Sequence, residues 1–124
     1  MIELAVEIRA EADGLVIVVT GSLDYDQAAP LDDALQHALT DRPAPGRITV
    51  DMAGVTFCDS AGLNGLLLAR RRAEQRGIPF VLARPSPAVT GLLHTTGADE
   101  VFVVGPGPGA PGDAAPGAQP RPET

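Results

Sequence analysis

Ser60 stands at a point in the sequence where a hydroxyl group could do chemistry. An apolar run, residues 55–58, stops at Asp59, and behind Ser60 a small residue and a glycine lead into a long helical pattern. A hydroxyl at the mouth of a helix could cap the helix, act as a nucleophile or accept a phosphate. These three interpretations make different demands on the rest of the sequence.

A nucleophilic Ser60 would lack the sequence motif and the nearby partner residues that catalysis needs. Nucleophile elbows of hydrolases follow the pattern G-x-S-x-G, whereas the local sequence here is CDSAG. The two histidines, His37 and His94, fall in other predicted helices, and His37 lies far from the loop in the predicted topology. We therefore expect that the protein is not an enzyme and has no catalytic residue.

Residue spacing does not favour a metal or cofactor site. One cysteine, Cys58, and two scattered histidines lack the spacing of zinc ligands. Gly62 and Gly65 do not belong to a phosphate-binding loop, because the Lys and the Ser or Thr of that motif are missing. We expect no metal and no cofactor, and we interpret Cys58 as a small buried residue.

The composition indicates an acidic protein of a reducing compartment. The 124 residues carry a net charge of −7, and an acidic surface repels the phosphates of nucleic acids. A single cysteine excludes an internal disulfide, no apolar run is long enough to cross a membrane, and the alternating N-terminus differs from a signal peptide. We expect a cytoplasmic protein, monomeric alone, that binds neither nucleic acid nor membranes. Only 3% of the residues are aromatic, so Leu, Val, Ile and Ala must build the core.

Hydrophobic periodicity predicts an α/β fold. Asp13-Gly14 is a hairpin-turn signal, so the first two strands should pair antiparallel. Strands are predicted at residues 2–8, 15–20, 47–52 with an extension at 55–57, 79–83 and 101–104, and helices at 26–40, 60–76 and 87–96. The order implies a mixed sheet of four to five strands with helices packed against it. Ser60 then lies just past the carboxyl end of a strand, where open α/β sheets usually bind ligands and partners.

We assign residues 1–104 to a single domain, which is followed by a change in composition. Eleven of the twenty residues 105–124 are Gly or Pro, and none is a large apolar residue. Such a segment cannot bury enough apolar surface to offset the entropy of ordering it. We predict that residues 105–124 form a disordered tail.

Three stretches of the sequence resemble the STAS family, and within it the bacterial anti-sigma factor antagonists. Residues 50–63, VDMAGVTFCDSAGL, resemble the family signature. Residues 20–24, TGSLD, resemble its "GELD" turn, and residues 84–99 resemble its "NPSPxV…LLxxTGLD" segment. The three pieces occur in the family's order, and the resemblance covers about residues 4–104.

The resemblance implies a phosphorylation switch at Ser60. In such proteins a serine-kinase anti-sigma factor, an ATP-binding protein with a histidine-kinase-like fold, phosphorylates the serine that follows the loop aspartate. The unphosphorylated protein binds that anti-sigma factor and frees a sigma factor, and a PP2C-type phosphatase resets the cycle. The same fold also serves as a non-phosphorylated scaffold subunit in transport or stress-sensing complexes, which is the alternative function.

Carried onto this chain, the switch predicts a partner-binding surface around Ser60. Its residues are Asp24, Asp59, Ser60, Ala61, Gly62, Asn64 and Leu68. Ala61 stands where the family often has a second serine, and Asn64 replaces a common glycine. We expect Gly62 to leave room for the phosphate donor, and Leu68 to point away from the core because of the helical period.

The physical chemistry of Ser60 allows a cap and a switch together. As a cap, its oxygen would accept a hydrogen bond from the amide of Gly62 or Leu63 and contribute about 1 kcal/mol. As a switch, it would gain roughly 1.5 to 2 negative charges on phosphorylation. A helix N-terminus accommodates a phosphate, so we expect a local electrostatic block of binding rather than a refolded domain.

Overall fold

A hairpin begins the sheet, as the Asp13-Gly14 turn predicts. The computed structural model describes residues 3–105. In it β1 (Ala5–Glu11) runs antiparallel to β2 (Gly14–Leu23), with Ile8 opposite Ile17. The predicted first strand, residues 2–8, therefore begins and ends three residues later than expected, and Ile2 lies outside the described residues.

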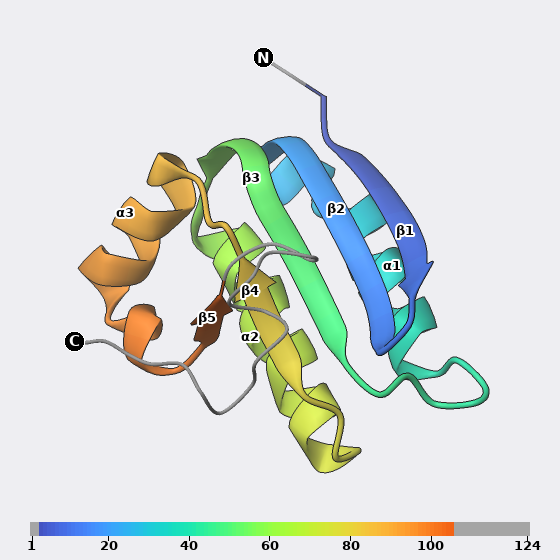
Figure 1. Cartoon of the computed structure of the whole chain (residues 1–124). Helices are drawn as coiled ribbons and strands as arrows, with labels where there is room; N and C mark the ends of the chain where they lie inside the picture. Colours follow the sequence, from blue (N-terminus) through green and yellow to red (C-terminus); the bar gives the residue numbers. More distant parts are fainter. Residues whose placement is uncertain (1–2, 106–124) are drawn as a thin grey trace.

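The remaining strands join the hairpin one after another and in parallel. β3 (Ile48–Cys58) pairs with β2, β4 (Phe80–Ala83) with β3, and β5 (Val103–Gly105) with β4. The sheet order is β1-β2-β3-β4-β5, so the predicted mixed sheet has five strands (Figure 1). Gly105, which the sequence placed in the tail, pairs with Ala83, and the rest of the predicted tail lies outside the described residues.

β2 and β3 are longer than the sequence patterns indicated. β2 continues through Gly21 to Leu23, and β3 continues through Gly54 to Cys58 as one strand. Register shifts between Val18 and Thr20 and between Gly21 and Ser22 accommodate the extra residues of β3. The extended pairing carries the ends of both strands to the same edge of the sheet, where Ser60 follows.

Three helices connect the parallel strands. They are α1 (Ala29–Leu39), α2 (Ser60–Gln75) and α3 (Pro87–Thr96), with short 3₁₀ turns at η1 (Tyr25–Gln27) and η2 (Ala98–Glu100). α1 and α2 lie behind the sheet in Figure 1, whereas α3 lies at its side, beyond β4 and β5. The predicted helix at 26–40 is divided, because Asp24 caps η1 and α1 begins separately with Pro30 in its first turn.

The core lies between the sheet and α1 and α2, and it is aliphatic as the composition requires. Alternate strand residues point toward the helices, and Ile17, Val50 and Leu82 are fully buried there. α1 contributes Leu31 and Leu35, and α2 contributes Leu63 and Leu66. This packing fixes the position of α2, and with it the position of Ser60.

Candidate functional site

Ser60 is the first residue of α2 and is exposed to solvent. It follows β3 at the carboxyl edge of the parallel strands, as the sequence predicted. No side-chain hydrogen bond within residues 3–105 involves its hydroxyl. The hydroxyl is therefore exposed to solvent, while the contacts of neighbouring residues position its backbone.

Asp59, and not Ser60, is the N-cap of α2. Its backbone is extended, with φ −107° and ψ −177°, and its Oδ1 accepts a hydrogen bond from the amide of Gly62 at 3.0 Å. Oδ2 accepts from the amide of Tyr25 at 3.1 Å, and the amide of Asp59 itself donates to the carbonyl of Leu23 at 3.2 Å. The interpretation of Ser60 as the cap is wrong, because the longer acidic side chain one residue earlier already satisfies the amide of Gly62.

Asp24 lies beside this loop, and its carboxylate is buried. The residue is 8% exposed, and its Oδ1 accepts from the amides of Asp26 and Gln27, both at 3.1 Å. The hydroxyl of Ser22 donates to Oδ2 at 3.2 Å. Asp24 thus shapes the turn next to Asp59 and offers a partner little surface of its own.

Gly62 is buried against the end of β2. A Cβ atom at this position would lie 2.7 Å from Cγ of Leu23 and 2.8 Å from its carbonyl oxygen. These contacts come from within the chain, so the small residue lets α2 approach β2 closely. That is a structural reason for the glycine, in addition to the expected access for a phosphate donor.

The exposed side of α2 carries Ser60, Asn64 and Leu68 at intervals of four residues. Such a spacing places side chains one above the other on one side of a helix. Asn64 is exposed and Leu68 is 46% exposed, whereas Ala61 is half-buried. Leu68 therefore points away from the core as the helical period predicted.

Two exposed aromatic residues near the loop were missed in the sequence. Tyr25, whose amide bonds to Asp59, is 80% exposed, and Phe57, two residues before Asp59, is 50% exposed. Exposed aromatic side chains often anchor protein partners. The available signal was their rarity, since the chain has three Phe, one Tyr and no Trp.

Cys58 is buried beneath the loop, as expected. Burial, together with the neighbouring charge of Asp59, raises the pKa of its thiol to about 11. The thiol is therefore protonated at neutral pH and is a weak nucleophile.

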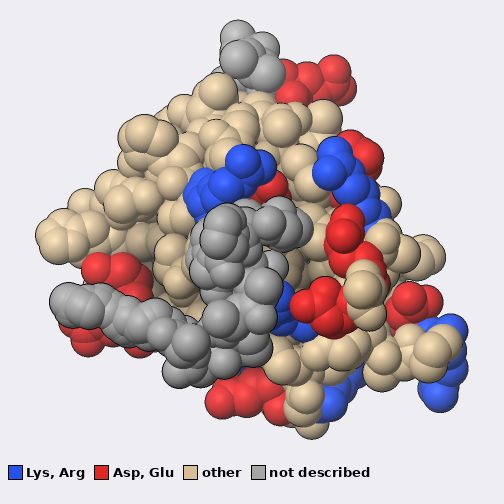
Figure 2. All heavy atoms as spheres, in the orientation of Figure 1, with Lys and Arg blue, Asp and Glu red and all other residues tan. Residues whose placement is uncertain are grey.

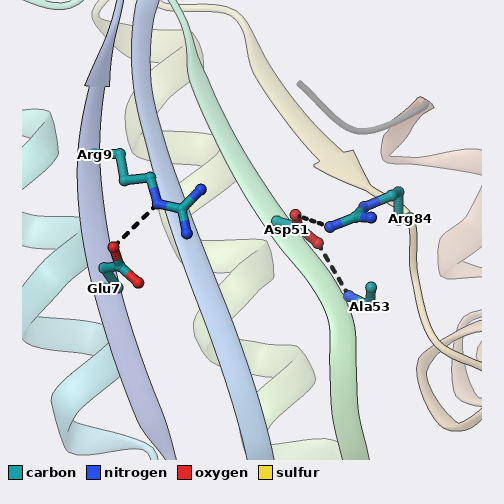
Figure 3. Close-up of polar contacts among 5 residues, drawn as sticks. All are labelled: Glu7, Arg9, Asp51, Ala53 and Arg84. Carbon is teal, nitrogen blue, oxygen red and sulfur yellow. Dashed lines mark hydrogen bonds and ion pairs between the residues drawn. The ribbon is translucent and has the colours of Figure 1, made fainter. Parts of the chain in front are cut away.

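A second polar cluster lies on the sheet face opposite α1 and α2 (Figure 3). Asp51 is 4% exposed, its Oδ2 lies 2.5 Å from Nη2 of Arg84, and its Oδ1 accepts from the amide of Ala53 at 3.1 Å. Arg84 has a φ of 49°, and the hydrogen bond and charge of Asp51 raise the pKa of its guanidinium. Nearby on β1, Arg9 pairs with Glu7 at 3.0 Å. Figure 2 shows acidic and basic side chains interspersed over this face.

The remaining expectations concern membranes and metals. No helix in the described range is both long and apolar enough to span a membrane. Among residues 3–105, no group of three or more His, Cys, Asp or Glu side chains is arranged to hold a metal ion.

Comparisons with known proteins agree with the sequence motifs. Residues 6–105 match the family model described as "Mlab, STAS domain". A STAS-domain containing protein of Pseudomonas aeruginosa (strain UCBPP-PA14) is 31% identical over 104 residues, which are 82% of this chain and 99% of that protein.

Solved structures show the same fold. A serine-to-glutamate variant of RsbS from Moorella thermoacetica superimposes with a TM-score of 0.69 at 26% identity, over 83% of this chain and 87% of that one. The anti-sigma factor antagonist SpoIIAA in its unphosphorylated form gives a TM-score of 0.68 at 22% identity, over 81% and 87% of the two chains. With a matching family model over nearly all of the described residues and a curated relative that is aligned over 99% of its length, the chain belongs to the STAS domain family.

Proposed function

We propose that the protein is an anti-sigma factor antagonist that works as a phosphorylation-controlled binding switch. In its unphosphorylated form it binds a serine-kinase anti-sigma factor and frees a sigma factor. The observation that carries the proposal is the exposed Ser60 hydroxyl, which has no hydrogen-bond partner among the described side chains, on a backbone held by Asp59. A kinase could reach this hydroxyl without breaking any contact of the fold.

The proposed switch acts on the surface and leaves the fold in place. A phosphate on Ser60 would sit at the N-terminus of α2, where the helix dipole and free amides favour an anion. It would add roughly 1.5 to 2 negative charges next to Asp59. A partner packed against this surface would have to desolvate all of these charges together, so phosphorylation releases it.

The proposal also assigns the remaining components. The kinase uses ATP and has a histidine-kinase-like fold, a PP2C-type phosphatase removes the phosphate, and the cycle runs in the cytoplasm. The protein contributes a substrate serine and a binding surface, and no catalytic residue. Asp24 and Gly62 support the surface from below, while Ala61, Asn64 and Leu68 extend it along α2.

Phosphosite mapping with a matched pull-down tests the switch. The protein is purified from its own cells, and its phosphate is located by mass spectrometry. In parallel, the proteins bound to Ser60→Ala and to Ser60→Asp are identified. A kinase of the histidine-kinase-like class should be recovered with Ser60→Ala and lost with Ser60→Asp. Thr95, an exposed hydroxyl residue on α3, provides the control, and Thr95→Asp should keep the partner.

A different result would favour the scaffold alternative. If Ser60 carries no phosphate under any growth condition and both Ser60 variants retain a transport or stress-sensing subunit equally, the switch is wrong. Ser60 would then be an exposed residue of a constitutive binding surface.

A further inference from the structure

A groove runs between α1 and α2 on the side of the molecule that carries the Ser60 helix. It has a volume of about 180 Å³. Its lining residues come from both helices: Asp32, Leu35, Gln36, Leu39, Gly65, Leu68, Ala69 and Arg72. Most of the lining is apolar, and its charged side chains are those of Asp32 and Arg72.

Asp32 places a carboxylate in this groove without a bonded partner. No hydrogen bond or ion pair in the described part of the chain involves its side chain. A Cβ atom on Gly65 would lie 2.8 Å from its Oδ1, so the glycine makes room for the carboxylate against α2. Partial burial raises the pKa of Asp32, the charge of Asp33 raises it further, and Arg72 lowers it.

Arg72 does not neutralise Asp32 directly. Its Nη1 donates to Oε1 of Gln36 at 3.2 Å, and this contact lies at the groove between the two helices. Leu68, 46% exposed, forms an apolar part of the lining. The groove therefore combines an exposed carboxylate that has no hydrogen-bond or ion-pair partner among the described residues with an exposed leucine.

The groove is continuous with the surface around Ser60. Ser60, Asn64 and Leu68 follow one another on the same side of α2. Eight residues of α-helix span about 12 Å, so a partner of ordinary interface size that contacts Ser60 also reaches the groove.

We propose that this groove receives an Arg or Lys side chain of the serine-kinase partner, whose cationic end pairs with Asp32 while its aliphatic part packs on Leu68. This inference rests on the proposed function, because it names how the same partner docks. Charge complementarity favours a cation, since the chain has a net charge of −7 and Asp32 lacks a partner. Arg and Lys are the side chains that combine a charge with an apolar stem.

The two parts of the surface then have separate effects. Pairing at Asp32 contributes equally to binding in the ground state and in the transition state of phosphoryl transfer, because the groove lies away from the reacting hydroxyl. Loss of the pair should therefore weaken binding and leave the chemical step unchanged. Phosphate on Ser60 releases the partner despite this anchor, through the desolvation described above.

Kinetics with the kinase recovered by the Ser60→Ala pull-down test the groove. Asp32→Asn should raise the KM for this protein as substrate by about tenfold or more and leave kcat within about twofold. Leu68→Ala should raise KM in the same direction. Asp33→Asn is the matched control, because Asp33 is exposed like Asp32 and carries the same charge one residue away, but does not line the groove. It should change KM less than threefold, and thermal unfolding should show all three variants folded.

The outcomes separate this inference from the proposed function. If Ser60 is phosphorylated but Asp32→Asn and Asp33→Asn have equal KM values, the proposed pairing at Asp32 is wrong and the proposed phosphorylation switch stands. A fall in kcat with unchanged KM for Asp32→Asn also overturns the pairing. Failure to recover any kinase that phosphorylates Ser60 overturns both.

Discussion

The backbone amide of Tyr25 donates to Oδ2 of Asp59 at 3.1 Å, across 34 residues of sequence. The other oxygen of the same carboxylate accepts from the amide of Gly62 at 3.0 Å. One side chain therefore joins the turn after β2 to the first turn of α2. Ser60 lies between these two attachments, and its backbone position depends on its neighbour.

Asp59 should contribute more to stability than Ser60. Asp59→Ala removes the cap of α2 and the bond to Tyr25, and we expect the free energy of unfolding to fall by about 1 to 3 kcal/mol. Ser60→Ala removes an exposed hydroxyl and should change it by less than about 0.5 kcal/mol. Urea denaturation of both variants measures the difference, and the opposite ranking would show that Ser60 is the cap after all.

Gly62 should not tolerate even a methyl group. Gly62→Ala places a Cβ against Leu23, and we expect a loss of about 1 to 3 kcal/mol from overpacking. Gly91, inside α3, has no atom within 4 Å of an added Cβ. Gly91→Ala should therefore stabilise the protein by up to about 1 kcal/mol. Thermal or urea unfolding of Gly62→Ala and Gly91→Ala measures the difference. Equal changes in the free energy of unfolding would show that the close approach of α2 to β2 is not the reason for Gly62.

The thiol of Cys58 should make stability fall at alkaline pH. Its pKa is raised to about 11 in the folded protein, above the ordinary value of 9.0, because burial disfavours the thiolate. A raised pKa means that the unfolded chain loses this proton first as the pH rises. The contribution is complete below pH 9 and is lost progressively toward pH 11. Urea midpoints from pH 8 to 11 should decline more steeply for the native sequence than for Cys58→Ala, and parallel curves would contradict the burial of the thiol.

Arg84 should matter more to stability than the other arginine on the same face. Arg84→Ala leaves the carboxylate of Asp51, 4% exposed, without its charged partner. Arg9→Ala breaks a pair in which both side chains are more than half exposed, so solvent compensates the loss. The urea midpoint should fall clearly for Arg84→Ala and little for Arg9→Ala.

A double-mutant cycle isolates the pair of Asp51 and Arg84. In the Asp51→Asn background, Arg84→Ala should cost much less, because no buried charge remains to be paired. Equal costs of Arg84→Ala in both backgrounds would show that the arginine stabilises the fold by other contacts.

Local patterns predicted the fold well because they record burial directly. The nearly continuous apolar run around Ile17 and the helical spacing of Leu31 and Leu35 reflect which segments and side chains are buried in the core. The Asp13-Gly14 turn fixed the hairpin, and the rest of the order followed from right-handed crossovers. The strand ends were less predictable, because the register shifts near Gly21 and Gly54 depend on pairing between distant segments.

The site was predictable in place but not in geometry. The sequence located Ser60 at the sheet edge, yet Asp59 and Ser60 are both common capping residues at adjacent positions. The bonds of the Asp59 carboxylate to the amides of Gly62 and Tyr25 decide between them. The pairing of Asp51 with Arg84 and the groove at Asp32 join segments that are far apart in sequence. No periodic pattern reports such contacts.

The strand order also has a consequence for synthesis. Because each strand pairs with the one made just before it, no later segment has to insert between strands that are already joined. The sheet can grow from β1 toward β5 as the chain leaves the ribosome, and each crossover closes a short stretch of sequence. The Ser60 loop is complete once β3 and α2 have emerged, so a nascent chain can expose Ser60 before its last strand is in place.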